Sequence, residues 1–397
     1  MNRFEVIVIG GGPAGALAAR DIARAGGRVA VVDGSHPREK ACGGGVTGRA
    51  LEVAGLAGST GSRGSGFTDG RVIRSVRFES GSRSTTIDLP AGYLEVFSRE
   101  AFDAALLRAA RDAGATWIDA RATSLARTDG VWTVTAGAGS ITAPWLLGAD
   151  GAGGIVRKQV TRPFERSQLS IAAGSFVDGV DLSEIVIRFV DDPRGYLWSF
   201  PRPGHVAAGT CAQADVTSTA AMHAVTDRWL DGYAPASGRP RRRYAWPIPS
   251  LSAADLDREH PAGDGWMLLG DAAGLVDPIT REGIFFALQS GALAAAALGA
   301  PDPARHYAGS VRAELHDELR RAANLKAGFF RPRFTSLLID ALEHSAAIRD
   351  VMRDLVAGRQ PYRGLKRRLL GTLELGLAWR ALRGDRGAEV GGGDGGA

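Results

Sequence analysis

Three glycines with the spacing Gly10-x-Gly12-x-x-Gly15 follow the apolar run Val6–Ile9 and precede an alanine-rich segment. Between a strand and a helix, such glycines allow a tight turn, let a pyrophosphate approach the backbone, and let the helix pack closely on the strand. We expect the helix to begin at Pro13 and Ala14, so that its unpaired N–H groups and positive dipole end face the phosphates. A second apolar run ends at Asp33, whose carboxylate is placed to accept hydrogen bonds from an adenosine ribose. The pattern predicts a parallel βαβ unit that binds a dinucleotide.

Two more apolar runs end next to glycine and an acidic residue. Residues 145–149 lead to Asp150, and residues 266–269 lead to Gly270 and Asp271. Apolar runs of this kind are typical of strands that are buried on both faces of a parallel sheet. We therefore expect both strands to join the dinucleotide-binding sheet.

A glycine-rich loop and two aromatic segments are the other unusual features. The segment Lys40-Ala-Cys42-Gly43-Gly44-Gly45 cannot be the interior of a helix, so we interpret it as a loop whose backbone passes close to a large group. Aromatic residues gather in Tyr196-Leu-Trp198-Ser-Phe200-Pro201 and in Tyr244-Ala-Trp246, within a β-rich stretch. Trp198 and Phe200 offer flat apolar walls for a ligand, although their spacing fits the core of a sheet equally well.

Composition excludes several classes of function. Hydrophobic residues make up 45% of the 397 residues, enough for a full core, and the net charge of +5 is spread along the chain. Because no aromatic-basic module or helix-turn-helix is found, the many arginines do not predict nucleic-acid binding. The seven histidines show no metal-ligand spacing, and no Gly-x-Ser-x-Gly elbow occurs. We therefore expect neither a metal site nor a serine hydrolase.

Cysteine usage and hydropathy indicate a cellular location. Cys42 and Cys211 do not form a disulfide framework, and neither a signal peptide nor an apolar run of about 18 residues is found. We expect a cytoplasmic protein, with a monomer favoured although the sequence does not fix the oligomeric state. Peripheral contact with a membrane surface stays open because the C-terminal helical stretch is basic, although a solvated face explains these residues more simply: Arg363, Lys366, Arg367, Arg368, Arg380 and Arg383.

The glycine–aspartate motifs, in this order, resemble the para-hydroxybenzoate-hydroxylase-like class of FAD enzymes. The resemblance implies noncovalent FAD held by Gly10, Gly12, Pro13, Ala14, Gly15, Asp33, Cys42, Gly43, Gly44, Arg99, Asp150, Gly270, Asp271, Gly283 and Ile284. It places Arg99 at the flavin chain and pyrophosphate, and Asp271 at a ribityl hydroxyl. The helix after Gly283 is then expected to direct its positive end at the flavin and stabilise its anionic reduced form. The chain departs from the class at Gly154, where a serine is common.

Within this class the chain is similar to the geranylgeranyl reductase family. The residues that carry the likeness are the Lys40–Gly45 loop, the Tyr196-x-Trp198-x-Phe200-Pro201 segment, and residues 270–284. The family implies that reduced FAD saturates isolated double bonds of a prenyl chain, which is a free diphosphate, a lipid, or the tail of chlorophyll or a quinone. We expect NAD(P)H or a small redox protein as the electron donor, since no second dinucleotide fingerprint is found.

The resemblance also suggests roles in the substrate pocket. Substrate contacts are expected from Gly45, Trp198, Phe200 and Trp246. Cys42 is a candidate proton donor because a neutral thiol is its default state near neutral pH, and Tyr196 is the alternative. A small apolar filler explains Cys42 equally well from the sequence alone.

Two other functions are compatible with the sequence. The first is a flavin monooxygenase, either a hydroxylase or, less readily, a halogenase, acting on an apolar natural product. Halogenases of this class show Trp-x-Trp-x-Ile-Pro and need a lysine in the flavin-side pocket, whereas Lys40 is the only lysine before residue 158. The second is a flavin-binding sensor without catalysis, which a long apolar pocket would argue against.

The order of elements and the resemblance together predict an α/β fold with three parts. We expect a Rossmann-like FAD-binding domain (1–80, 98–160 and 262–300), a second, mainly antiparallel β-sheet domain for substrate (81–97 and 161–261), and a helical C-terminal region (301–383). Locally, residues 71–78 and 84–89 predict a β-hairpin, and Ser98 is expected to cap a helix over 99–113. The glycine-rich stretches 57–70 and 384–397 are expected to be mobile and disordered, respectively.

Overall fold

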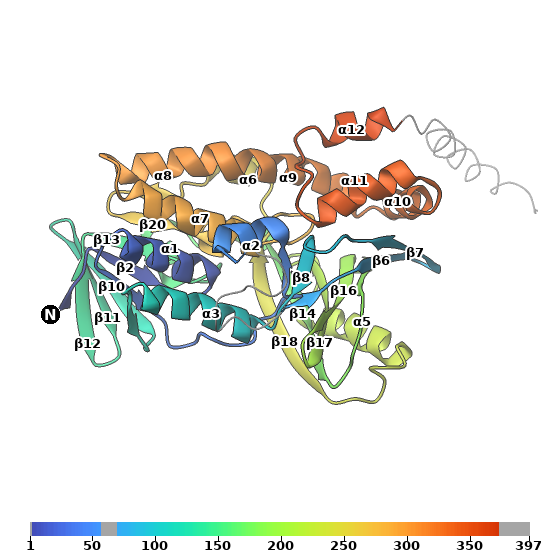
Figure 1. The fold of residues 1–397 in the computed structure, drawn as a ribbon, viewed down its shortest axis with the longest axis horizontal. Coiled ribbons are helices and arrows are strands. Elements are labelled where there is room, and N and C mark those ends of the chain that lie inside the picture. The colour runs from blue at the N-terminus through green and yellow to red at the C-terminus, as the bar shows by residue number, and fades with distance from the viewer. Residues whose placement is uncertain (1, 57–69, 373–397) are drawn as a thin grey trace, which may run out of the picture.

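A computed structural model describes residues 2–56 and 70–372 of the chain (Figure 1). Residues 57–69 and the predicted disordered tail 384–397 lie outside the described residues. The elements form a mostly parallel sheet with covering helices, a large antiparallel sheet, and a group of C-terminal helices (Figure 1). The predicted fold class is therefore confirmed.

Apolar runs form a six-stranded sheet in the order β19-β20-β13-β2-β3-β9. Its strands are β2 (Val6–Ile9), β3 (Val29–Val32), β9 (Thr116–Ile118), β13 (Trp145–Gly148), β19 (Ala262–Gly263) and β20 (Trp266–Leu268). All neighbours are parallel except β19 and β20. Because β2, β13 and β20 are adjacent and parallel, their carboxyl ends bring Gly10, Asp150 and Asp271 to one edge of the sheet.

Three helices cover this sheet: α1 (Pro13–Arg24), α3 (Arg99–Asp112) and α7 (Ile284–Ala297). They lie side by side with α1 between the other two (Figure 1). The close approach of α1 and α7 depends on Gly291, since a Cβ there would lie 2.5 Å from the carbonyl oxygen of Ala14. Ser98 caps α3 as predicted, because its Oγ accepts a hydrogen bond from the backbone N–H of Ala101.

Smaller elements complete this half of the molecule. A four-stranded sheet contains β1 (Asn2–Arg3), β10 (Ala122–Thr128), β11 (Val131–Ala136) and β12 (Gly139–Ala143), and a three-stranded sheet contains β4 (Gly45–Thr47), β5 (Arg71–Val72) and β8 (Leu94–Val96). Short helices are α2 (Gly48–Ala54), α4 (Ile155–Val160) and α6 (Ala253–Arg258), with 3-10 turns at Arg166–Gln168 and Gly270–Ala273. The three-stranded sheet holds the end of the glycine-rich loop, because β4 begins at Gly45.

The second half is a seven-stranded sheet in the order β18-β14-β17-β16-β15-β6-β7. Its strands are β6 (Ser75–Ser80), β7 (Arg83–Asp88), β14 (Leu169–Asp178), β15 (Ile185–Asp191), β16 (Arg194–Arg202), β17 (His205–Gln213) and β18 (Arg241–Pro249), and α5 (Thr219–Gly232) packs on β14 and β17. Neighbours are antiparallel except β6 and β15. The hairpin predicted near 71–89 is present as β6–β7. Both of its strands belong to this sheet, so the segment that we expected to begin at residue 81 begins at Ser75.

Helices make up most of the C-terminal region up to Gly371, and residues 373–383 of the predicted helical region lie outside the described residues. Its helices are α8 (Pro303–Val311), α9 (Asp317–Phe329), α10 (Pro332–His344), α11 (Ala346–Val356) and α12 (Leu365–Gly371), with one π-helical turn at Arg312–His316. Apolar residues of α10 and α11, such as Ile339 and Met352, share one hydrophobic cluster with Tyr196 and Trp198 of β16. The C-terminal helices therefore cover a face of the seven-stranded sheet. No helix in the described part of the chain is long and apolar enough to cross a bilayer.

Candidate active site

The glycines after β2 adopt the geometry that their spacing predicts. Gly10 has φ +106°, and a Cβ there would lie 2.3 Å from the carbonyl oxygen of Ala149. At Gly15 a Cβ would lie 2.0 Å from the carbonyl oxygen of Gly10, so only glycine fits. A Cβ on Gly12 would meet only the ring of His36, at 3.6 Å. The backbone at Gly12 is therefore open to a ligand, and α1 begins at Pro13 as expected.

Asp33 is already bonded to donors of its own chain. Its carboxylate accepts hydrogen bonds from the N–H of Gly11 at 2.7 Å, from Ser35, and from Nδ1 of His36 at 2.7 Å. Burial raises the pKa of Asp33, but the bond and charge of His36 and the other donors outweigh it and lower the pKa well below its usual range. The carboxylate that we expected to bind a ribose thus orders the dinucleotide loop. His36 was not predicted, and no sequence pattern marks it.

One cavity of about 270 Å³ connects the two halves of the molecule. At the edge of the parallel sheet it is lined by predicted cofactor residues, namely Pro13, Cys42, Gly43, Gly44, Arg99, Asp271, Gly283 and Ile284. All four predicted substrate residues and Tyr196 line it too: Gly45, Tyr196, Trp198, Phe200 and Trp246. Predicted residues outside the lining are Gly10, Gly12, Ala14, Gly15, Asp33, Asp150 and Gly270.

Most of the remaining cavity wall is apolar and was not predicted, although Lys40, Thr47, Thr280, Arg281 and Glu282 also line it. It comes from β6, β15 and the C-terminal helices, with Val76, Phe78, Ile185, Ile187, Phe189, Phe329, Phe330, Met352, Leu355 and Val356. These residues are far apart in the sequence, and the sequence does not distinguish them from ordinary core residues. Only the packing of α9 and α11 on the sheet turns them into walls of a chamber.

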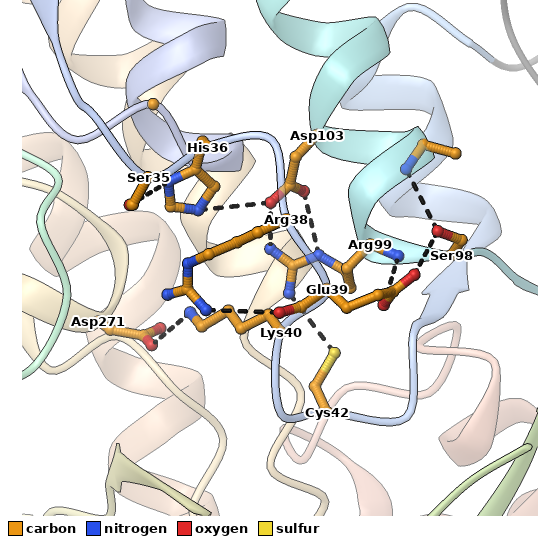
Figure 2. A network of polar contacts seen from close by, with 12 residues as sticks. Ser35, His36, Arg38, Glu39, Lys40, Cys42, Ser98, Arg99, Asp103 and Asp271 are labelled. Atoms are coloured by element: carbon orange, nitrogen blue, oxygen red, sulfur yellow. Dashed lines mark hydrogen bonds and ion pairs between the residues drawn. The ribbon is translucent and has the colours of Figure 1, made fainter. Parts of the chain in front are cut away.

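Cys42 lies among cationic side chains (Figure 2). Its Sγ is 3.5 Å from Nη1 of Arg99 and 3.5 Å from Nη2 of Arg202. Burial raises the pKa of the Cys42 thiol, but the charges of Arg99, Arg202 and Lys40 together lower it below its ordinary value. The surrounding charges therefore favour the thiolate more than around an ordinary cysteine, and a thiolate cannot donate a proton until it has taken one up.

Buried ion pairs hold the loop around Cys42 in place. Arg99 donates from Nε and Nη2 to both carboxylate oxygens of Asp103, at 3.0 and 2.9 Å. Glu39 accepts hydrogen bonds from Ser98 and Arg202 (Figure 2 shows Glu39, Ser98, Arg99 and Asp103). Arg202 is almost fully buried and also donates to the carbonyl oxygen of Gly43, at 3.1 Å. Glu39 and Arg202 were missed from the sequence, where each looks like an ordinary surface charge.

The large group that the glycine-rich loop approaches is the ring of Phe200. A Cβ on Gly43 would lie 2.7 Å from Cγ of Phe200, and a Cβ on Gly45 would lie 2.9 Å from its Cε1. Gly44 has φ +84°, and a Cβ there would lie 2.3 Å from the carbonyl oxygen of Phe97. Packing against Phe200 of β16 and against Phe97, which follows β8, therefore requires glycine at these three positions.

The residues after β20 form a second ordered loop at the cavity. Nζ of Lys40 lies 3.4 Å from Oδ2 of Asp271 (Figure 2). Asp277 accepts hydrogen bonds from the N–H groups of Ile279 and Thr280, at 2.7 and 3.0 Å, and from the hydroxyl of Tyr362 at 2.8 Å. The C-terminal region thus holds the loop that leads to α7. Asp277 stands within the resemblance motif, but nothing marked Tyr362 in advance.

Asp150 explains the departure from the class at Gly154. Oδ2 of Asp150 accepts a hydrogen bond from the N–H of Val156 at 3.0 Å, and Oδ1 is buried with no partner among the described residues. Burial raises the pKa of Asp150 to about 6. A Cβ on Gly154 would lie 2.1 Å from Oδ1, so a serine would collide with the carboxylate.

Tyr196 of β16 directs its hydroxyl at the loop that follows β20. The hydroxyl of Tyr196 donates to the carbonyl oxygen of Thr280 at 3.1 Å, and the ring stacks on Phe330 with 6.0 Å between centroids. Burial raises the pKa of Tyr196 well above its usual value, so the phenol stays protonated. The guanidinium of Arg38 lies over the ring of Trp246, 4.8 Å from the ring centroid.

Three side chains of α10 could act as metal ligands, but two of them pair with an arginine instead. Asp340, Glu343 and His344 hold ligand atoms within 4.8 Å of one another. Both carboxylates, however, contact the guanidinium of Arg83. We assign no metal there.

These residues fit a bound FAD. The backbone at Gly12 is open, and the N-terminus of α7 and the carboxylate of Asp271 face one cavity. A helix N-terminus and open glycine backbone are the elements that bind pyrophosphate and flavin in α/β folds.

Comparison with known proteins agrees with this geometry. Residues 3–322 match a family described as FAD binding domain. Menaquinone reductase of Mycolicibacterium smegmatis is 30% identical over 329 residues, which cover 74% of this chain and 76% of that protein. Geranylgeranyl diphosphate reductase of Rhodobacter capsulatus is 28% identical over 316 residues, which cover 74% and 75%.

Solved structures show the same fold. A geranylgeranyl bacteriochlorophyll reductase-like protein from Thermoplasma acidophilum superimposes with a TM-score of 0.75 at 21% identity, covering 94% of this chain and 100% of that one. The flavin-dependent brominase Bmp2 has a TM-score of 0.68 at 19% identity, covering 93% and 99%. At these identities the likeness concerns the fold alone. The family match, the menaquinone reductase relative and the site geometry agree, and the chain belongs to the FAD binding domain family of FAD-dependent oxidoreductases, as its resemblance to the geranylgeranyl reductases predicted.

Proposed function

We propose that the protein reduces isolated carbon–carbon double bonds of a prenyl chain of the geranylgeranyl type. The observation that carries the proposal is the single cavity that joins the dinucleotide edge, at Pro13 and Asp271, to a chamber walled by aromatic and aliphatic side chains. A polar substrate would make few apolar contacts with that wall, whereas an isoprenoid chain would pack against it. Relatives named for geranylgeranyl diphosphate and for menaquinone support the proposal, because both of those molecules contain a prenyl chain.

The chemistry explains why such a chamber is needed. An isolated alkene has no carbonyl that the protein could polarise, so catalysis must come from placing the chain and excluding water. FAD, when bound, would supply the hydride. The protein's own part is to hold the chain between β16 and the C-terminal helices, where Trp198, Phe330 and Met352 keep the cavity apolar.

The reaction also needs a proton on the second carbon. Tyr196 holds one on its Oη at the cavity wall, where its raised pKa keeps the phenol protonated, and this hydrogen must leave the carbonyl oxygen of Thr280, 3.1 Å away, to reach a substrate. Cys42 has the opposite tendency, since Arg99 and Arg202 favour its thiolate. We therefore place Tyr196 ahead of Cys42 as the proton donor, with NAD(P)H or a small redox protein proposed as the source of electrons.

An anaerobic titration tests the proposed function. The FAD-loaded protein is reduced with dithionite, mixed with geranylgeranyl diphosphate, which has no quinone ring to accept the electrons, and followed by the return of the oxidised flavin absorbance. We expect reoxidation without oxygen, and Tyr196→Phe should keep its FAD but reoxidise about 10²–10⁴ times more slowly. If the flavin stays reduced with every prenyl substrate, the proposal is wrong.

Oxygen-dependent chemistry is the second candidate, because Lys40 lines the cavity and halogenases of this class use a lysine there. Its Nζ, however, is directed at Asp271, 3.4 Å away, rather than into the apolar chamber. Oxygen uptake that depends on an apolar aromatic substrate would favour this monooxygenase or halogenase function over a reductase.

A further inference from the structure

Exposed apolar side chains are concentrated at one end of the molecule. Four of the five large hydrophobic residues that are exposed in the described chain lie on α10 and α12: Phe334, Leu337, Leu369 and Leu370. Leu370 is 78% exposed. Figure 1 shows α10, α11 and α12 gathered at the end of the molecule opposite the N-terminal strand. Single exposed apolar residues need no explanation, but a concentration of them marks an interaction surface.

A series of aromatic rings connects this end to the cavity. Phe189 and Phe329 both line the cavity, and their ring centroids are 6.1 Å apart. The ring of Phe329 is in turn 5.2 Å from that of Phe334, which is 41% exposed at the start of α10. The apolar lining therefore continues to the protein surface at Phe334.

Cations outnumber acidic residues near the exposed apolar side chains, since Asp340 and Glu343 of α10 pair with Arg83 and Asp354 pairs with Arg368. Residues 331–338 and 364–371 contain Arg331, Arg333, Lys366, Arg367 and Arg368 and no acidic residue. Arg331, Arg333, Lys366 and Arg367 are exposed, and Arg368 is half-buried and pairs with Asp354. Cations beside exposed leucine and phenylalanine are the composition of surfaces that bind anionic lipid bilayers.

We propose that this C-terminal surface, made of Phe334, Leu337, Leu369 and Leu370 with the cations Arg331, Arg333, Lys366 and Arg367, docks on an anionic lipid bilayer. A bilayer is favoured over a protein partner because the aromatic series leads from the surface into an apolar cavity, and a lipid phase is where an apolar chain would be held. An apolar chain would pass from the bilayer along Phe334 and Phe329 into the chamber. The passage of substrate rests on the proposed function, whereas the docking itself does not.

Vesicle sedimentation tests the docking without any substrate. The full-length, FAD-loaded protein is mixed with vesicles of phosphatidylcholine alone or with phosphatidylglycerol added. We expect sedimentation with the anionic vesicles and much less with the neutral ones. Reversal of one charge, Arg331→Glu or Lys366→Glu, should weaken binding by about fivefold or more, because each cation near an anionic surface contributes roughly that factor. Arg3→Glu, at the exposed N-terminal strand of the opposite end, is the matched control and should bind like the wild type.

The apolar residues are tested in the same way. Phe334→Ser and Leu370→Ser should reduce sedimentation, whereas Val216→Ser should not, although Val216 is 67% exposed and lies outside both helices. Circular dichroism and retained flavin verify that each variant is folded. The inference is overturned if the wild type stays in the supernatant with anionic vesicles, if it forms dimers that Leu370→Ser dissolves, or if the control variants lose as much binding as the test variants. A protein that binds vesicles but does not reduce prenyl chains would keep this inference and contradict the proposed function.

Discussion

The Sγ of Cys42 lies 3.5 Å from Nη1 of Arg99 at the cavity wall. Because Arg99, Arg202 and Lys40 lower the pKa of the thiol against the effect of burial, the thiolate should be present below the pH at which an ordinary cysteine ionises. We expect iodoacetamide to label Cys42 with a half-maximal rate below the ordinary thiol pKa, as followed by mass spectrometry. Lys40→Met should move that midpoint upward, and Cys211, which is buried, should stay unlabelled. A midpoint at or above the ordinary value would contradict the electrostatic explanation.

Substitutions at the dinucleotide edge should remove FAD without unfolding the protein. Gly12→Val places a branched side chain on backbone that is open to a ligand, and Asp271→Ala removes a carboxylate from the cavity. Loss of one charged hydrogen-bond acceptor should weaken FAD binding about tenfold or more, and Gly12→Val should abolish it. The flavin-to-protein absorbance ratio after purification measures both effects. Gly139→Ala, where a Cβ meets nothing within 4 Å, should keep full flavin content. Wild-type occupancy in either test variant would show that the motif is misassigned.

The packing between the glycine-rich loop and β16 can be tested by measuring the stability of variants at Gly43. A Cβ on Gly43 would lie 2.7 Å from the Phe200 ring, so Gly43→Ala should lower the free energy of unfolding by about 1–3 kcal/mol. Urea unfolding measures this change, with Gly232→Ala as a control because that position has open space. Adding Phe200→Leu to Gly43→Ala should restore part of the loss. If the double variant is no more stable than the single one, the contact with Phe200 is not the reason for glycine at this position.

Asp150 should make stability depend on pH. Its pKa is raised by burial from 3.8 in the unfolded chain to about 6 in the folded protein. The folded state is therefore favoured by protonation, and this contribution is fully present below pH 3.8 and is lost as the pH rises through about 6. Relative to Asp150→Asn, the wild type should lose of order 3 kcal/mol between pH 4 and pH 7. Urea unfolding of both FAD-loaded proteins at several pH values measures the difference, and parallel curves would rule out a raised pKa.

The local elements were predictable because each depends on nearby residues. The strand before Gly10, the helix at Pro13 and the cap at Ser98 follow from short-range patterns that the structure confirms. The three glycines after Cys42 indicated a close approach, but the partner is Phe200, more than 150 residues away, which no local pattern could name. The sequence placed Asp33 at the end of its strand, but it did not show that His36 and Ser35 turn back onto its carboxylate.

The apolar chamber could be predicted only in part. Trp198 and Phe200 stood out through their spacing, whereas Phe329 and Met352 resemble any other core residue of a helix. Their role depends on how α9 and α11 pack on the seven-stranded sheet, which is a long-range property of the fold. The link between Tyr362 and Asp277 is of the same kind.

The mass of the product tests the central claim most directly. The FAD-loaded protein is reduced with dithionite under anaerobic conditions and given geranylgeranyl diphosphate, which has no quinone ring, and the mass of the extracted product is measured by mass spectrometry after a single turnover. Reduction of a double bond predicts a product that has gained two hydrogen atoms and no oxygen, in an amount equal to the flavin reoxidised. A lipid of unchanged mass, or a product that forms only in air and carries an added oxygen atom, would contradict the assignment of this FAD-dependent oxidoreductase as a prenyl-chain reductase.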